Sequence, residues 1–207
     1  MSDYVPLFVD ISGLRTIVFG GGNVALRKCR YLKGADITVI ARDVLPELEG
    51  IVSKTVRRDI PEDVSDMIGP YDFVMVATDN KELNSRIRDQ VLSAGKYVNS
   101  AHGGGNVLIP SVLEREHYTV AVSSNGNVPA FPPYVVSALD TFLDSRYDRM
   151  IDLMIEMRAY AMRNIPEQKD RKDFLQSVIN DMDIQSAVAN DDVETAKKLA
   201  LNKVNKT

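Results

Sequence analysis

The stretch of sequence that decides the fold runs from Leu14 to Ala25 and reads LRTIVFGGGNVA. Its first half is a short run dominated by apolar and β-branched residues, which is typical of a strand buried on both faces in a parallel sheet. Three glycines end this run, and the segment after them has apolar residues at helical spacing, with Gly34 placed where a helix would end. A second apolar strand is expected at residues 37–41. Strand, helix and strand together predict a βαβ unit.

The glycine turn matches the spacing GxGxxA, with Gly20, Gly22 and Ala25 at the three fixed positions. Between a strand and a helix, the first glycine permits a tight turn and the second lets the backbone approach a diphosphate. The alanine allows the helix to pack closely on the strand. The unpaired N–H groups and the positive dipole end at the start of that helix favour an anionic group. The turn therefore predicts a dinucleotide site that includes Gly20 and Gly22.

The rest of the chain continues this alternation and then changes character. Further strands are expected at residues 71–78, 97–99 and 118–123, and helices at residues 82–94 and 134–163. Alternating strands and helices predict an α/β fold, a Rossmann-type parallel sheet with helices on both faces. Pro129, Pro132 and Pro133 are expected to break the chain before a helical C-terminal part. Short helices follow, the last opened by Asp191 with Glu194 three residues later.

Composition limits the classes of protein that the chain can represent. It has 207 residues, 44% of them apolar and 26% charged, so a packed core is expected. The formal net charge of -4 argues against a nucleic-acid-binding protein, because phosphate binding requires a basic surface. Cys29 is the single cysteine, which excludes an intramolecular disulfide and a cysteine zinc cluster, and no metal site is predicted. No signal peptide or membrane-spanning stretch is visible, which predicts a cytoplasmic protein without a membrane partner.

The residues after the second strand bear on the choice of dinucleotide. NAD sites of this type usually place an acidic side chain there to bind the ribose hydroxyls. Here the strand ends at Ala41 and is followed by Arg42 and Asp43. Asp43 suits the ribose of NAD, whereas Arg42 suits the 2′-phosphate of NADP, so these residues alone leave the choice open.

Several segments between residues 4 and 130 resemble, in order and with compatible spacing, the motifs of one family. They are YVPLFVD at residues 4–10, VFGGGNVALRK at 18–28, ATDN at 77–80 with Asn84, VN at 98–99, IPS at 109–111 and AVSSNG at 121–126. On these motifs the chain resembles the precorrin-2 dehydrogenases, a family that includes the N-terminal region of siroheme synthase and bifunctional dehydrogenase–ferrochelatases.

The resemblance implies a domain order and an activity. It implies an NAD-binding Rossmann domain at residues 1–112, a dimerisation region at 113–148 and a helical C-terminal domain at 149–207, assembled as a homodimer. It implies NAD as the hydride acceptor and a tetrapyrrole as the substrate, with precorrin-2 oxidised to sirohydrochlorin. Some members also insert Fe2+ into the product. Carried over by position, the residues that contact the cofactor are Asn23, Val24, Arg42, Asp43 and Thr78.

The chain departs from the family pattern at the position of its key carboxylate. The family has an aspartate three residues after the asparagine of the VN motif, and the residue three after Asn99 is His102. A group that titrates near neutral pH can accept the proton released on desaturation, and a neutral imidazole can also ligate Fe2+. His102 is therefore the candidate catalytic residue.

A second departure concerns positive charge. The substrate of the family is a polycarboxylate, which calls for several cationic donors. The helix that follows the AVSSNG motif in the sequence carries no basic residue near its start. Arg27, Lys28 and Arg30 on the first helix, or Arg115, are the candidate replacements. Two other functions stay open on these grounds: metal insertion as the main activity, and a non-catalytic module that binds a dinucleotide or a tetrapyrrole.

Overall fold

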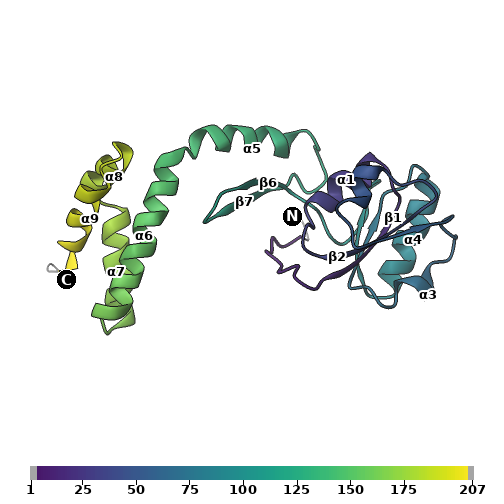
Figure 1. Cartoon of the computed structure of the whole chain (residues 1–207), viewed down its shortest axis with the longest axis horizontal. Coiled ribbons are helices and arrows are strands. Elements are labelled where there is room, and N and C mark those ends of the chain that lie inside the picture. The colour runs from purple at the N-terminus through teal and green to yellow at the C-terminus, as the bar shows by residue number, and fades with distance from the viewer. Residues whose placement is uncertain (1–3, 205–207) are drawn as a thin grey trace. The chain divides into compact units, whose positions relative to one another are not determined.

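The computed structural model describes residues 4–204, which form two compact units. The first unit comprises residues 4–110 and 123–129, and the second comprises residues 111–122 and 130–204 (Figure 1). Each unit has a hydrophobic core of its own. The finer division into three domains that the resemblance implies stays a prediction.

A five-stranded parallel sheet forms the centre of the first unit (Figure 1). The strands are β1 (Arg15–Phe19), β2 (Asp36–Ala41), β3 (Lys54–Arg57), β4 (Phe73–Val76) and β5 (Tyr97–Ser100). Their spatial order is β3-β2-β1-β4-β5, and every neighbouring pair is parallel, which confirms the α/β prediction. After β3 the chain returns to the other side of β1, so the strand order reverses between β1 and β4. Open sheets of this kind bind ligands at such a reversal, beyond the carboxyl ends of the strands.

Helices cover both faces of this sheet, as predicted. They are α1 (Asn23–Arg30) and α2 (Pro46–Glu49) on one face, and α3 (Ser65–Ile68) and α4 (Lys81–Ser93) on the other. Side chains of β1 alternate between the two cores, because successive strand residues point to opposite faces. Val18 packs with Ala25 and Cys29 of α1, while Phe19 packs with Ile87 of α4.

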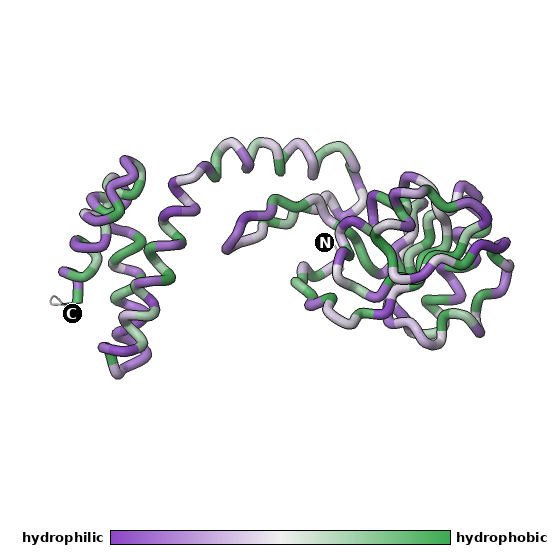
Figure 2. Tube along the Cα trace, in the orientation of Figure 1, coloured by the Kyte–Doolittle hydropathy of each residue, from purple (hydrophilic) through white to green (hydrophobic). Residues whose placement is uncertain are grey.

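The second unit consists of a hairpin followed by helices. The antiparallel strands β6 (Ser111–Glu114) and β7 (Thr119–Val122) pack against α5 (Phe131–Phe142). The helices α6 (Ser145–Asn164), α7 (Gln168–Ile179), α8 (Met182–Ala189) and α9 (Val193–Leu201) follow. Apolar and polar residues alternate along them (Figure 2), and their apolar faces meet around Met157, Phe174 and Ile184. Within residues 4–204, no helix is long and apolar enough to cross a membrane.

Several strand expectations differ from the structure. The resemblance implies an opening strand at residues 4–10, but these residues form no strand. Their apolar side chains Leu7 and Phe8 are exposed, so no core is available to order them as one. The strands β3 and β6 were not predicted. The sequence KTVR of β3 is short and mostly polar, as an edge strand can be, and β6 is a four-residue strand that pairs only with β7.

The single helix expected at residues 134–163 is two helices, because α5 ends at Phe142 and the Asp144 carboxylate caps α6 by accepting from the backbone N–H of Arg146 at 3.0 Å. Two helix starts also differ from the expectation. Helix α5 begins at Phe131, three residues before the expected start. Prolines are tolerated in the first turn of a helix, because the N–H groups that they lack would have no acceptor within the helix at those positions. The last helix is capped by Asp192 and not by Asp191: the Asp192 carboxylate accepts from the backbone N–H of Thr195 at 3.1 Å. Asp191 precedes the cap with a left-handed φ of 61°.

Candidate functional site

The glycine turn leaves β1 in a conformation that only glycine adopts easily. The Gly20 N–H donates to the Ile40 carbonyl at 3.0 Å, which extends the sheet by one residue. Gly20 then turns with φ of 118°, and a Cβ on it would lie 2.4 Å from the carbonyl oxygen of Ala77. The absence of a side chain therefore brings the turn against the end of β4.

The middle glycine is equally constrained, although the GxGxxA pattern treats it as variable. A Cβ on Gly21 would lie 2.2 Å from the carbonyl oxygen of Asp43. The Gly21 carbonyl also accepts from the N–H of Leu45 at 3.0 Å. The turn after β1 is thus packed directly against the segment that follows β2. The signal available in the sequence was the unbroken run of three glycines.

The third glycine faces open space at the start of α1. Gly22 is the N-cap residue with φ of -91°, and a Cβ on it would meet no atom within 4 Å. No side chain caps the helix, and its first turn has no acidic residue. The first N–H groups, which belong to Asn23, Val24 and the buried Ala25, therefore remain available to an anionic ligand. This arrangement fits the diphosphate of a dinucleotide.

The residues after β2 lie beside this turn, and both side chains are exposed. The Arg42 Nε donates to Asp59 Oδ1 at 2.8 Å, and this hydrogen bond, with the charge of Asp59 and a smaller contribution from Asp43, raises the pKa of Arg42. Arg42 is therefore paired with Asp59, and the carboxylate of Asp43 lies close enough to contribute.

At the end of β4, Thr78 is linked to His102 through a buried asparagine. Asn84, on α4, accepts from the Thr78 hydroxyl at 2.6 Å, and its Nδ2 lies 2.7 Å from Nδ1 of the exposed His102. His102 follows β5, the neighbour of β4, and so lies at the same edge of the sheet as the glycine turn. Asn84 was part of the ATDN motif but was not predicted as a site residue. An asparagine at a buried helix position was the available signal.

A hydrogen bond connects α1 to the strand end that precedes the His102 loop. Asn99 is buried, and its Nδ2 donates to the Val107 carbonyl at 2.8 Å while its Oδ1 accepts from Lys28 Nζ. Burial, with a smaller contribution from the charge of Arg27, lowers the pKa of Lys28. Lys28 therefore joins the helix to the loop and does not project toward a ligand.

The four basic residues considered for the substrate carboxylates differ in availability. Lys28 is used by Asn99, and Arg115, which lies in the second unit, donates to Asp140 at 2.7 Å. Arg27 and Arg30 are exposed on α1. The described residues contain no group of three or more His, Cys, Asp or Glu side chains that could hold a metal ion.

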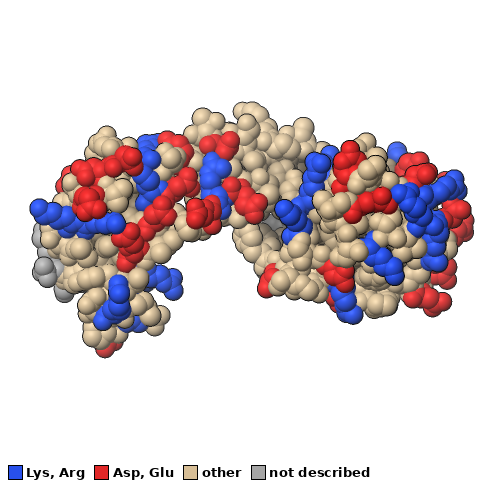
Figure 3. Space-filling view, viewed as in Figure 1, with Lys and Arg blue, Asp and Glu red and all other residues tan. Residues whose placement is uncertain are grey.

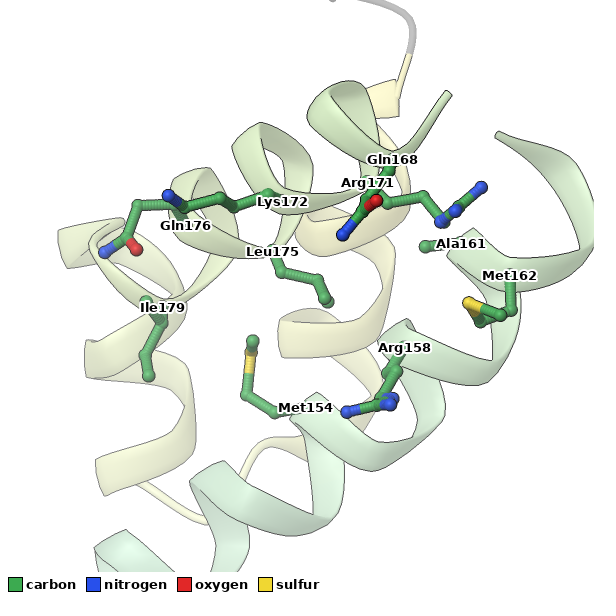
Figure 4. Close-up of a pocket in the computed structure, with 10 residues that line it drawn as sticks. All are labelled: Met154, Arg158, Ala161, Met162, Gln168, Arg171, Lys172, Leu175, Gln176 and Ile179. Carbon is green, nitrogen blue, oxygen red and sulfur yellow. The ribbon is translucent and has the colours of Figure 1, made fainter. Parts of the chain in front are cut away.

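A separate groove lies in the second unit, between α6 and α7 (Figure 4). Its volume is about 560 Å³. Met154 and Leu175 form an apolar floor, and Arg158, Arg171 and Lys172 supply positive charge with no acidic residue in the lining. None of the residues predicted for the cofactor or for catalysis lines this groove.

Comparison with known sequences agrees with the geometry of the first unit. Residues 7–111, about half of the chain, match the family model "Putative NAD(P)-binding". A precorrin-2 dehydrogenase of Methanosarcina barkeri is 30% identical over 188 residues, which are 86% of this chain and 84% of that protein. Siroheme synthases of Azotobacter vinelandii and Pseudomonas putida are 31% and 32% identical over 85% of this chain, which spans 39% of their length.

A solved structure named "SirC, precorrin-2 dehydrogenase" is similar in fold. Its TM-score is 0.74 at 23% identity, and the match covers 99% of this chain and 100% of that one. The structural likeness supports the fold, and the sequence matches carry the assignment. The chain belongs to the precorrin-2 dehydrogenase and siroheme synthase N-terminal family, and it has the NAD(P)-binding domain of that family.

Proposed function

We propose that the chain is an NAD-dependent dehydrogenase that oxidises precorrin-2 to sirohydrochlorin. The observation that carries the proposal is the open start of α1 behind Gly22, at the same sheet edge as Thr78 and His102. Such an edge can hold a dinucleotide and a second ligand side by side. The relatives named as precorrin-2 dehydrogenases supply the substrate class.

In this proposal the chain mainly positions the reactants. Gly20, Gly22, Asn23 and Val24 surround the diphosphate, and Thr78 lies where β4 meets the turn. When bound, the nicotinamide accepts the hydride. The protein contributes by holding the nicotinamide and the substrate in one relative orientation.

The charges after β2 favour NAD over NADP. A 2′-phosphate would have to displace Asp59 from Arg42 and would approach both Asp59 and Asp43. An exposed ion pair is weak and can be displaced, but the two carboxylates would remain close to the added phosphate. A ribose hydroxyl can instead donate to Asp43 without adding charge.

We also propose a homodimer formed through the region around α5. The sequence has no Asp, Glu, Lys or Arg between Glu116 and Asp140, and the surface over the part of α5 that precedes Asp140 is correspondingly free of charged side chains (Figure 3). Phe131, Tyr134 and Phe142 are 52%, 70% and 62% exposed. A contiguous apolar face of this kind is rarely left open to water. A molar mass of one chain by light scattering at micromolar concentration would contradict the dimer.

The decisive experiment follows the NADH absorbance band while the protein is incubated with precorrin-2 and either dinucleotide. Formation of NADH, faster than formation of NADPH, is the expected result. A parallel incubation of sirohydrochlorin and Fe2+ without dinucleotide tests metal insertion. Metal insertion without NADH formation would replace the proposal by a chelatase, and dinucleotide binding without either reaction would replace it by a binding module.

We place the reaction in the cytoplasm, where the dinucleotide pool is available.

A further inference from the structure

The buried amide of Asn84 uses every hydrogen-bonding position that it has. Its Oδ1 accepts from the backbone N–H of Thr78 at 3.2 Å and from the Thr78 hydroxyl at 2.6 Å. Its Nδ2 donates to the Thr78 carbonyl oxygen at 2.9 Å and lies 2.7 Å from Nδ1 of His102. A primary amide has two acceptor and two donor positions, so all four are occupied in a fully buried side chain.

These contacts determine which ring nitrogen of His102 carries the hydrogen. The backbone N–H of Thr78 can only donate, so the atom facing it must be Oδ1 of Asn84 and the atom facing His102 must be Nδ2. Because an amide nitrogen can only donate, Nδ1 of His102 has to accept. The hydrogen of the neutral ring is therefore on Nε2. Turning the ring over would place a carbon against Nδ2 and leave a buried N–H without an acceptor, which is costly.

We propose that Asn84 is a positioning residue that holds His102 in the Nε2–H tautomer, so that the exposed ring donates a hydrogen bond to a carboxylate of the substrate. The identity of this carboxylate ligand as precorrin-2 rests on the proposed function. The tautomer itself does not.

This role differs from the proton-accepting role that the sequence suggests. In the Nε2–H tautomer the lone pair of Nδ1 is committed to Asn84, and Nε2 already carries a hydrogen. His102 then has no free lone pair with which to take a proton or to ligate Fe2+. To gain one, the ring would have to release a fully buried N–H of Asn84.

The loop around His102 holds the ring in this arrangement. The N–H of Ala101 donates to the Val76 carbonyl at 2.8 Å, which ties the loop to β4. Asn106 bridges two residues of the β5 region, because its Oδ1 accepts from the Val98 N–H at 2.7 Å and its Nδ2 donates to the Lys96 carbonyl at 3.0 Å. The ring is thus presented by a fixed loop, as recognition of one carboxylate requires.

The tautomer can be measured directly by long-range proton–nitrogen NMR of the full-length protein labelled with 15N-histidine. The chain has two histidines, so the variant His117→Gln assigns the signals. The expected spectrum shows a protonated Nε2 and an unprotonated Nδ1 for His102. A protonated Nδ1, or rapid exchange between both tautomers, would overturn the proposal in the unmodified protein.

The variant Asn84→Asp tests the cause of the tautomer. An ionised carboxylate only accepts, so the ring is expected to change to the Nδ1–H tautomer. Asn80→Asp is the matched control: it adds the same charge at the exposed N-cap of α4, where aspartate caps as well as asparagine. A changed tautomer in the Asn80→Asp variant, or an unchanged one in a folded Asn84→Asp variant, would contradict the role of Asn84.

Steady-state kinetics test the binding role with precorrin-2 as the probe. His102→Ala is expected to raise KM roughly tenfold, as loss of one hydrogen bond to a charged group does, with kcat within about twofold. His102→Gln keeps an N–H donor and is expected to recover part of the loss. A fall in kcat at unchanged KM would overturn the carboxylate-binding role. If the unmodified protein forms no NADH, the proposed function fails, while the NMR result stands separately.

Discussion

The substitution Gly22→Ala separates the ligand-binding role of the glycine turn from its structural role. The backbone at Gly22 has φ of -91° and ψ of -169°, which alanine adopts without strain, and the added methyl meets no atom within 4 Å. Removing a glycine lowers the entropy of the unfolded chain by the equivalent of about 0.4–1 kcal/mol, and alanine is a poorer N-cap by roughly 0.5–1 kcal/mol. The free energy of unfolding is therefore expected to stay within about 1 kcal/mol of the unmodified protein.

The same methyl is expected to weaken dinucleotide binding. It would stand in the open space before the first N–H groups of α1, where the diphosphate approaches. Losing one hydrogen bond to a charged group costs about 1.5–3 kcal/mol, which corresponds to an increase in Kd of roughly 10–150-fold. Isothermal titration calorimetry with NAD measures this change directly.

Gly20→Ala is the matched control, because it adds the same methyl group to another glycine of the turn, two residues before Gly22. A left-handed φ of 118° and a Cβ placed 2.4 Å from the Ala77 carbonyl oxygen are both unfavourable. Backbone strain and overpacking together are expected to cost about 2–6 kcal/mol of unfolding free energy, measured by urea denaturation. Unchanged NAD affinity in Gly22→Ala, or equal stability of the two variants, would refute the reasoning.

Three further predictions concern the sheet edge and the core. His102→Ala is expected to lower kcat/KM for precorrin-2 about tenfold at unchanged Kd for NAD, because β4 separates the ring from the glycine turn; unchanged kinetics would remove His102 from the site. Asp59→Asn is expected to release Arg42 and lower the Kd of NADP relative to that of NAD, and calorimetry showing an unaltered ratio would contradict this. Burial raises the pKa of the Cys29 thiol to about 12, so a thiol reagent at neutral pH is expected to label it only in urea; fast labelling of the folded protein would argue otherwise.

The first βαβ unit could be predicted from sequence because local pattern and tertiary role agree there. The run that forms β1 is apolar enough to be buried on both faces, and three glycines mark its end. In β3, by contrast, only Val56 of the sequence KTVR is a strong apolar residue. Its strand conformation depends on parallel pairing with β2, and the local sequence of β3 does not indicate this pairing. A short and mostly polar edge strand such as β3 is therefore hard to predict from a single sequence, whereas the edge strand β5 was predicted.

The candidate site shows the same limit at the level of side chains. Gly20 and Gly22 follow from a motif with a backbone mechanism. The partners of Arg42 and His102, which are Asp59 and Asn84, lie 17 and 18 residues away in the chain and are brought together only by packing. Sequence reasoning therefore predicts candidate ligand-binding residues but not the buried or distant residues that contact them.

The contact between Lys28 and Asn99 joins two parts of the sheet edge mechanically. One end of this brace lies on the helix whose start faces the cofactor, and the other lies three residues before His102. We therefore expect a tilt of α1 to be transmitted to the His102 loop through the partly buried ammonium group of Lys28. A substitution that shifts α1 is therefore expected to shift the loop of the proposed substrate site as well.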